Sequence, residues 1–216
     1  FPSRHFVEAV AERTEGAAYT KRVEIIADAL HEFLPQDYSK SLTILLSILG
    51  PENTEETGMF KNFYWIMPIG KFVEKYGLDD FDRSIHALEE ITKRNTGEYA
   101  VRPFIRQYPD RSLVVLRQWA ESNNFHLRRL ASEGLRPKLP WSTKLDIFND
   151  DPSVVFEILE LLKEDEVTFV KKSVANHMTD WLKVNPSRAR ELLARWKMSN
   201  NRHTQWIVKR ATRKIS

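Results

Sequence analysis

The sequence of 216 residues contains no cysteine, which excludes disulfides, thiolate zinc sites, iron–sulfur clusters and a cysteine nucleophile. Metal-binding motifs are absent as well, because the six histidines, at positions 5, 31, 86, 126, 177 and 203, have no HExxH or other paired spacing. A glycine-rich phosphate-binding loop is also missing. We therefore expect neither a metal nor a cofactor, and we expect His177 to pack or cap rather than bind a ligand.

Long hydrophobic runs are absent too. The stretch from Leu42 to Leu49 is flanked by polar residues and is far shorter than the ~18 apolar residues that a membrane helix needs. The N-terminus has no secretory pattern, and it starts at Phe1, so we expect a few residues to precede it. Together with the lack of cysteine, this composition fits a protein of the reducing cytoplasm that has no membrane partner.

Glycine is scarce, with only seven residues, which argues against a fold rich in hairpins. Apolar residues instead recur with helical periodicity along nearly the whole chain. Proline and glycine separate the periodic segments, which predicts helices at 3–13, 18–34, 37–49, 60–76, 80–95, 98–108, 111–121, 125–134, 143–149, 153–163, 167–183, 187–198 and 203–214. Short helices joined by short loops predict an all-α fold of stacked antiparallel helix pairs.

A weak internal repeat supports this fold. Three segments share an apolar residue, two basic residues and then a small or apolar core residue; they begin at Leu127, Val170 and Val208. Their basic pairs lie 43 and then 38 residues apart, near the period of HEAT and armadillo repeats. Residues 109–216 hold 20 Lys and Arg against 13 Asp and Glu, whereas residues 1–108 hold 13 against 17. Repeated basic pairs could therefore line a groove that binds phosphates, although such pairs also cap helices or meet acids in repeats of every function.

Three segments depart from ordinary helix sequence. The first runs from Thr96 to Pro103, where Thr96 can cap a helix and Glu98 would lie in its first turn. The second runs from Arg128 to Trp141, and its two prolines would fix the directions of Arg136 and Trp141. The third runs from Val174 to Trp181 and has Asp180 beside an apolar stripe, where a carboxylate is costly unless it has a partner or a function.

These segments resemble the AlkC/AlkD type of DNA alkylation-repair glycosylases, and the AlkC branch most of all. The AlkC pattern reads T/S-x-E-F/Y-A-x-R-P, then RRLASEG-x-RP-x-LPW, then V-R-R-S-V-A-N-x-x-x-D. This chain matches the second element almost letter for letter over 128–141, and the third over 170–180 with two lysines in place of the arginines. It departs from the pattern at Met178-Thr179, where Leu-Asn is usual. The resemblance extends from about residue 60 to the C-terminus.

The resemblance implies a single HEAT-like α–α superhelix over residues 1–216, with an N-terminal helical cap over about 1–58 and repeats carrying the site over about 60–216. It implies that Glu98, Glu133 and Asp180 are the active-site carboxylates. Residues that would contact the lesion or the DNA are Trp141, Arg136, Arg129, Arg128, Lys172 and Arg102. Some relatives carry a further immunoglobulin-like domain, and we expect none here because no strand pattern follows residue 200.

The implied activity is hydrolysis of the N-glycosidic bond of cationic N3-alkylated bases, 3-methyladenine first and 3-methylcytosine as an extension. The implied partner is alkylated double-stranded DNA, bound by a monomer in the bacterial cytoplasm or nucleoid, without metal or cofactor. A HEAT-repeat protein that binds unusual DNA without excising bases is the main alternative. A protein-binding HEAT scaffold would explain the repeats but not the proline-braced segment that leads to Trp141.

Overall fold

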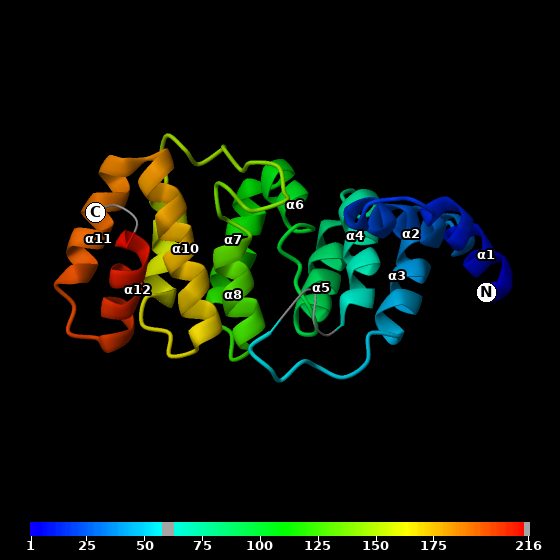
Figure 1. Cartoon of the computed structure of the whole chain (residues 1–216), viewed down its shortest axis with the longest axis horizontal. Coiled ribbons are helices and arrows are strands. Elements are labelled where there is room, and N and C mark those ends of the chain that lie inside the picture. The colour runs from blue at the N-terminus through cyan, green and yellow to red at the C-terminus, as the bar shows by residue number, and fades with distance from the viewer. Residues whose placement is uncertain (58–62, 214–216) are drawn as a thin grey trace. The chain divides into compact units, whose positions relative to one another are not determined.

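A computed structural model describes residues 1–57 and 63–213 of the chain (Figure 1). Every regular element within these described ranges is a helix, and the chain divides into two compact units, Phe1–Pro103 and Phe104–Ser216. The predicted all-α, HEAT-like fold is thus confirmed. The boundary that the sequence predicts between cap and repeats, at residues 58–60, lies outside the described residues. No described helix combines the length and the apolarity that crossing a membrane requires.

Five α-helices and one 3-10 helix lie entirely within the described residues of the first unit. Their bounds are α1 Ser3–Thr14, α2 Tyr19–Phe33, α3 Tyr38–Ser47, η1 Tyr64–Ile66, α4 Met67–Tyr76 and α5 Phe81–Thr92. Asp37 and Asp80 cap α3 and α5, since each side chain accepts a hydrogen bond from a backbone N–H of the first turn. Capping satisfies a donor that has no partner inside the helix.

Helix α4 lies at the centre of the first unit and packs against α2, α3 and α5. Phe72 and Val73 on its apolar face are buried, as are Ala27 of α2 and Leu88 of α5. The sequence predicts a helix from residue 60, but α4 begins at Met67. Phe63 has a left-handed backbone with φ of 58°, and Pro68 stands at the first turn, so the α-helix starts after the 3-10 turn. Residues 60–62 of that prediction lie outside the described part.

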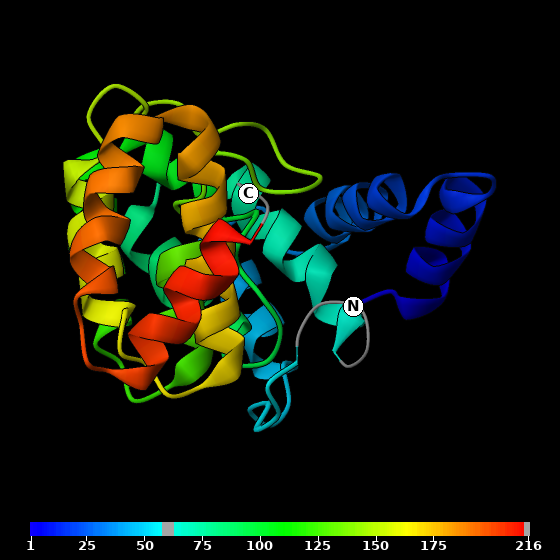
Figure 2. The ribbon, with the colours of Figure 1, turned by 60° about the vertical axis from the view of Figure 1, so that its left-hand side comes forward.

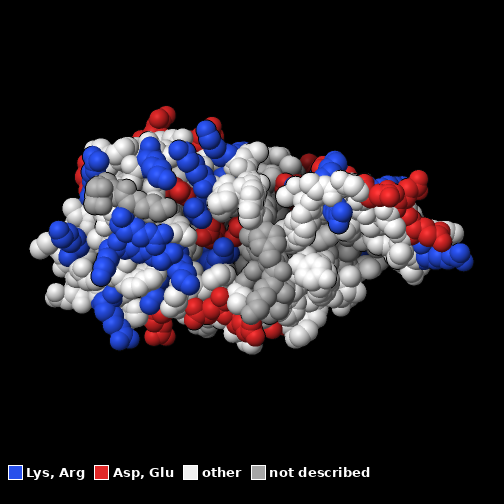
Figure 3. Space-filling model, in the orientation of Figure 1, with Lys and Arg blue, Asp and Glu red and all other residues white. Residues whose placement is uncertain are grey.

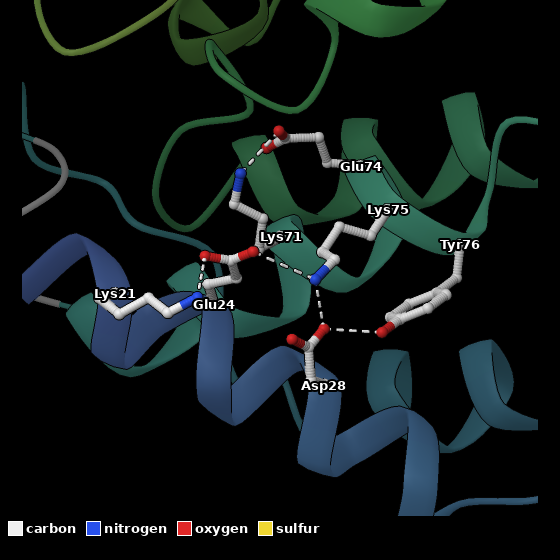
Figure 4. A network of polar contacts seen from close by, with 7 residues as sticks. All are labelled: Lys21, Glu24, Asp28, Lys71, Glu74, Lys75 and Tyr76. Carbon is white, nitrogen blue, oxygen red and sulfur yellow. Dashed lines mark hydrogen bonds and ion pairs between the residues drawn. The ribbon is translucent and has the colours of Figure 1, made fainter. Parts of the chain in front are cut away.

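A polar network joins α2 to α4 across the surface of the first unit (Figure 4). Lys75 Nζ lies 2.5 Å from Asp28 Oδ1 and 3.3 Å from Glu24 Oε1, and Tyr76 Oη donates to Asp28 Oδ1 at 2.6 Å. Burial acts to raise the pKa of Asp28, but the hydrogen bonds from Lys75 and Tyr76 outweigh it and hold that pKa below its ordinary value. The network therefore favours the ionised carboxylate and stabilises the contact between α2 and α4.

We predict that Asp28→Asn lowers the free energy of unfolding at pH 7 by about 0.5–1 kcal/mol, as expected for a partly exposed network. Because the pKa of Asp28 is lowered in the folded state, its contribution is present above the unfolded pKa and is lost as pH falls through the folded pKa. Thermal melts of the variant and the wild type should therefore converge as pH falls to about 3. Asp150→Asn, an exposed carboxylate, is the control. An equal difference at pH 7 and pH 3 would contradict the prediction.

The second unit consists of helix pairs. Helix α6 spans Arg102–Gln107 and crosses the boundary between the units; the others are α7 Pro109–Ala120, α8 Phe125–Glu133, α9 Ser153–Leu162, α10 Thr168–Val184, α11 Pro186–Lys197 and α12 Arg202–Thr212. The second helices of successive pairs stack on one another, so that α10 packs between α8 and α12 (Figures 1 and 2). The three repeated basic segments fall on these three helices, as the repeat predicts.

One predicted helix, at 143–149, is absent: these residues form turns and irregular backbone. The backbone N–H of Leu145 donates to the carbonyl of Pro137 at 3.1 Å, and the Asn185 side chain donates to the carbonyl of Asn149 at 3.0 Å. Buried Leu145 and Phe148 anchor the segment. Prolines on both sides and these tertiary contacts override a short apolar pattern. The result is one long loop between α8 and α9.

Candidate functional site

Two buried carboxylates on neighbouring helices share one arginine in the second unit. Arg136 Nη1 lies 2.9 Å from Glu133 Oε2, and Arg136 Nε lies 2.8 Å from Asp180 Oδ2. Only 4% of Glu133 and 8% of Asp180 is exposed. The structure thus brings together three residues that the sequence analysis selected from two separate segments. We call Glu133, Arg136 and Asp180 the carboxylate–arginine cluster.

The local fold fixes this geometry. Helix α8 ends at Glu133, and the backbone N–H of Arg136 donates to the carbonyl of Glu133 at 3.2 Å, closing a turn. Leu135, which is 1% exposed, anchors that turn in the core. The chain therefore turns back at the end of α8 and carries the Arg136 guanidinium towards α10, where Asp180 lies one helical turn before the C-terminus.

Burial and charge act in opposite directions on these groups. Burial raises the pKa of Asp180, the nearby Glu133 carboxylate adds to that rise, and Arg136 opposes both without cancelling them. Burial acts to lower the pKa of Arg136, but the two carboxylates outweigh it and leave that pKa raised. The surroundings of Asp180 therefore make its charged form less favourable than it is in water. Shifted pKa values of this kind are common at functional sites.

Arg129 of α8 and Phe169 of α10 extend the cluster. Arg129 Nη2 lies 3.8 Å from Glu133 Oε1, and its guanidinium carbon lies 4.5 Å from the centre of the Phe169 ring. Stacking on an aromatic ring orients a guanidinium. Sequence analysis selected Arg129 but missed Phe169. An aromatic side chain in the first turn of a helix, before the buried apolar positions begin, is the signal that could have indicated it.

A buried contact between α8 and α10 lies behind the cluster. Ser132 Oγ lies 3.4 Å from His177 Nδ1, and His177 stacks on Trp181 with ring centres 6.3 Å apart. Ser132 and His177 are fully buried. Ser132 directly precedes Glu133, and His177 lies about one helical turn before Asp180. The contact between Ser132 and His177 therefore fixes the register of the two helices that carry the carboxylates. His177 packs, as the sequence predicts.

Arg128 is engaged elsewhere. Its Nε lies 2.6 Å from Asp165 Oδ2, and its Nη1 donates to the backbone carbonyls of Ser122 and Asn123 at 2.9 and 3.0 Å. The side chain thus joins the loop before α8 to the loop before α10. This geometry favours a structural role, and the contact with DNA that the resemblance implies for Arg128 stays a prediction.

Trp141 projects from the long loop that follows α8. Trp141 is 74% exposed, and its backbone is left-handed with φ of 59°. That conformation is uncommon for a bulky residue and marks local strain. Buried Leu139 and Leu145 anchor the loop on either side, and Arg106 of α6 donates to the carbonyl of Lys144. The loop therefore holds an aromatic ring on the surface.

Glu98 and Arg102 belong to the first unit, where each is almost fully buried, with 3% and 1% exposed. Helix α6 begins at Arg102, so Glu98 lies in the turn before it and not in its first turn, which corrects the predicted start at 98. Thr96 Oγ1 accepts from the backbone N–H of Glu98 at 3.2 Å and donates to its carboxylate at 3.1 Å. Thr96 therefore orients the Glu98 carboxylate, although it does not cap a helix.

Lys172 is exposed on α10, next to the buried Lys171.

No group of three or more His, Asp and Glu side chains among the described residues is arranged to hold a metal ion. The carboxylate–arginine cluster, Arg129 and Phe169 supply fixed charge, hydrogen bonding and aromatic stacking.

We predict that Arg136→Gln destabilises the protein by about 2–4 kcal/mol at pH 7.5, because it leaves two buried carboxylates without their cation. Without Arg136 the pKa of Asp180 would rise further, so the stability loss of the variant grows as pH rises through that folded pKa and largely disappears below about pH 4. Thermal melts at both pH values measure this effect. Arg117→Gln, which breaks the exposed pair with Glu157, should cost at most ~1 kcal/mol. Equal losses in the two variants would refute a central role for Arg136.

Comparison with known proteins identifies the family of this chain. A family model described as DNA alkylation repair enzyme matches residues 70–215. The uncharacterised protein YhaZ of Bacillus subtilis is 39% identical over 195 residues, which cover 90% of this chain and 52% of YhaZ. The alkylpurine DNA glycosylase AlkC of Pseudomonas fluorescens, solved bound to DNA with an abasic site analog, has 34% identity and a TM-score of 0.86, covering 100% of this chain and 58% of AlkC.

The chain thus spans little more than half the length of YhaZ and of AlkC. AlkD2 of Streptococcus mutans has a TM-score of 0.69 at 21% identity, over 97% of both chains, which shows the shared fold. The resemblance to AlkC and AlkD proteins is confirmed, and AlkC superposes better than AlkD2. The chain belongs to the DNA alkylation repair enzyme family.

Proposed function

We propose that this protein is a DNA glycosylase that hydrolyses the N-glycosidic bond of cationic N3-alkylated bases in double-stranded DNA, as a monomer and without a metal or cofactor. The observation that carries the proposal is the carboxylate–arginine cluster in a chain of this family. Its two carboxylates are buried, lie on adjacent helices and are held by one arginine. Bases such as 3-methyladenine and 3-methylcytosine are the substrates that suit this charge.

The chemistry of the lesion explains why carboxylates suffice. An N3-alkylated base carries a positive charge and leaves without protonation by a general acid. Cleavage of its glycosidic bond develops positive charge on the sugar, which a fixed negative charge stabilises. A water molecule must then attack the sugar carbon. Carboxylates in a site of low water content can supply both the charge and the orientation of that water.

The bonding of Asp180 divides these tasks between its two oxygens. Arg136 Nε occupies Oδ2, whereas no hydrogen bond from a described residue reaches Oδ1. In the proposal, Oδ1 accepts a proton of the attacking water and faces the cationic sugar, and Arg136 fixes the carboxylate's orientation. Glu133 assists through its charge. Glu98, in the first unit, joins the proposal as the third carboxylate on the resemblance alone.

Binding of DNA would come from basic and aromatic side chains. Figure 3 displays Lys and Arg side chains gathered over α10 and α12 in the second unit. Arg129, stacked on Phe169, and the exposed Lys172 are the proposed phosphate contacts near the cluster. The resemblance also implies DNA contacts for Arg102 and Arg128. Arg102 is buried, and Arg128 forms an ion pair with Asp165. We therefore assign both arginines a supporting role.

We predict that the wild type releases free 3-methyladenine from methylated duplex DNA in the presence of EDTA. Asp180→Asn should lower the single-turnover rate of release by about 100–1000-fold, the effect of removing one transition-state electrostatic contact. Affinity for the duplex should change by less than about threefold, since phosphate contacts dominate binding. Because its surroundings raise the pKa of Asp180, the variant should melt no lower than the wild type at pH 7.5.

Asp146→Asn, which removes an exposed carboxylate of the α8–α9 loop, is the matched control and should excise normally. Full activity of Asp180→Asn would refute the assignment of Asp180. If the wild type binds duplex DNA but releases no base, the chain is the non-catalytic DNA-binding relative that the sequence analysis kept as its alternative.

We predict a separate role for Trp141 in recognising the lesion, by stacking its ring on the damaged base pair or the gap beside it. Trp141→Ala should leave the melting temperature unchanged, because the residue is 74% exposed. The variant's preference for a lesion-containing duplex over an undamaged one should be about fivefold or more below that of the wild type, since stacking on a base is worth about 1–3 kcal/mol. Fluorescence anisotropy with both duplexes measures this ratio. Trp65→Ala, at an exposed tryptophan of the first unit, should keep the wild-type ratio, and a similar loss in both variants would contradict the prediction.

A further inference from the structure

A second polar cluster, made only of cationic and donor groups, lies on α10 and α12. Lys171 Nζ is 3.1 Å from His203 Nδ1, and Arg202 Nε is 3.3 Å from His203 Nε2. Both nitrogens of one imidazole thus face a donor. A neutral imidazole has only one acceptor nitrogen, and a protonated one has none. The ring therefore cannot satisfy both neighbours in either protonation state.

An indole ring supports the same group of cations. Lys171 Nζ lies 5.6 Å and Arg210 Cζ 5.4 Å from the centre of the Trp206 ring. Lys171 is only 9% exposed, and Arg210 Nε is buried without a hydrogen-bond partner. Cation–π contacts position both side chains but offer no acceptor for their remaining donors.

Among the described residues, no carboxylate lies within ion-pair distance of these cations. Of the elements packed against α12, α10 carries Lys171 and Lys172 in its first turns. The last turn of α11 carries Lys197 and Arg195, which lies 3.8 Å from Glu160. Helix α12 itself has no acidic residue. The nearby α9–α10 loop carries exposed Glu164 and Glu166, and neither forms an ion pair within 4.0 Å in the described part of the chain. A buried cation without a counter-charge is costly.

We propose that Lys171, Arg202 and His203 form a binding site for a phosphodiester of the DNA backbone, and that His203 takes up a proton when the phosphate binds. This inference rests on the proposed function, because it names a contact for the same DNA. Phosphate oxygens supply the acceptors that the three side chains lack, and the imidazolium then donates to the phosphate. The Trp206 ring holds Lys171 in place.

The proton linkage has a defined sign. Bound phosphate stabilises the charged imidazole, so the complex holds a proton that the free protein holds less firmly. Affinity for DNA must then rise as pH falls, over the range in which histidine changes its charge. Lysine and arginine keep their charge over this range. Any pH dependence of DNA affinity that disappears when His203 is replaced therefore comes from its imidazole.

The test measures the affinity for a short undamaged duplex between pH 6 and pH 8 by fluorescence anisotropy. We expect the wild type to bind roughly fivefold more tightly at pH 6 than at pH 8, and His203→Gln to remove most of that difference. Lys171→Gln and Arg202→Gln should each lower the slope of log affinity against log salt by about 0.9. Arg202 is exposed, so its variant tests the site without disturbing the core.

Two control variants isolate the site. His86→Gln removes an exposed histidine of the first unit, and Lys209→Gln removes an exposed cation of α12; both should keep the wild-type pH dependence. Unchanged pH dependence in His203→Gln would overturn the inference, and so would wild-type affinity that does not vary with pH. Excision of 3-methyladenine at saturating enzyme concentration separates the two proposals. Excision without proton-linked binding overturns only this inference, whereas proton-linked binding without excision overturns only the proposed function.

Discussion

Arg136 occupies the position on which the candidate site depends, because one guanidinium holds the carboxylates of two different helices. Glu133 closes α8 and Asp180 belongs to α10, and their negative charges would repel each other without the cation between them. Burial strengthens that repulsion. The arrangement lets the protein keep two carboxylates close together and largely shielded from water, with one oxygen of Asp180 left for another partner.

The packing of the second unit supports this local balance of charge. Helix α10 contacts α8 on one side and α12 on the other, so a single helix carries Asp180 towards one end and Lys171 near its start. The buried pair of Ser132 and His177 fixes the register between α8 and α10. The proposed excision chemistry and the proposed phosphate site therefore share one rigid element, with negative charge at one position and positive charge at the other.

Much of this could be predicted from sequence. Helical periodicity predicted most helices to within a few residues, since apolar stripes and prolines are local signals. The segment 143–149 was predicted wrongly, because contacts from Pro137 and Asn185 decide its backbone. The resemblance selected Glu133, Arg136 and Asp180, and the structure shows why they belong together. Phe169, His203 and Trp206 were missed, because each meets its partner only when helices that are far apart in the sequence pack together.

The three basic pairs have a consequence for how such repeats diverge. Arg128 joins two loops through Asp165, Lys171 is buried against Trp206, and Lys209 is exposed. Equivalent positions of one duplicated motif thus serve as a structural clamp, an interior cation and a solvent-facing charge. Each copy can change under its own selective pressure while the helix pairs keep their shape, so a family built from one repeated unit can acquire new ligands without acquiring a new fold.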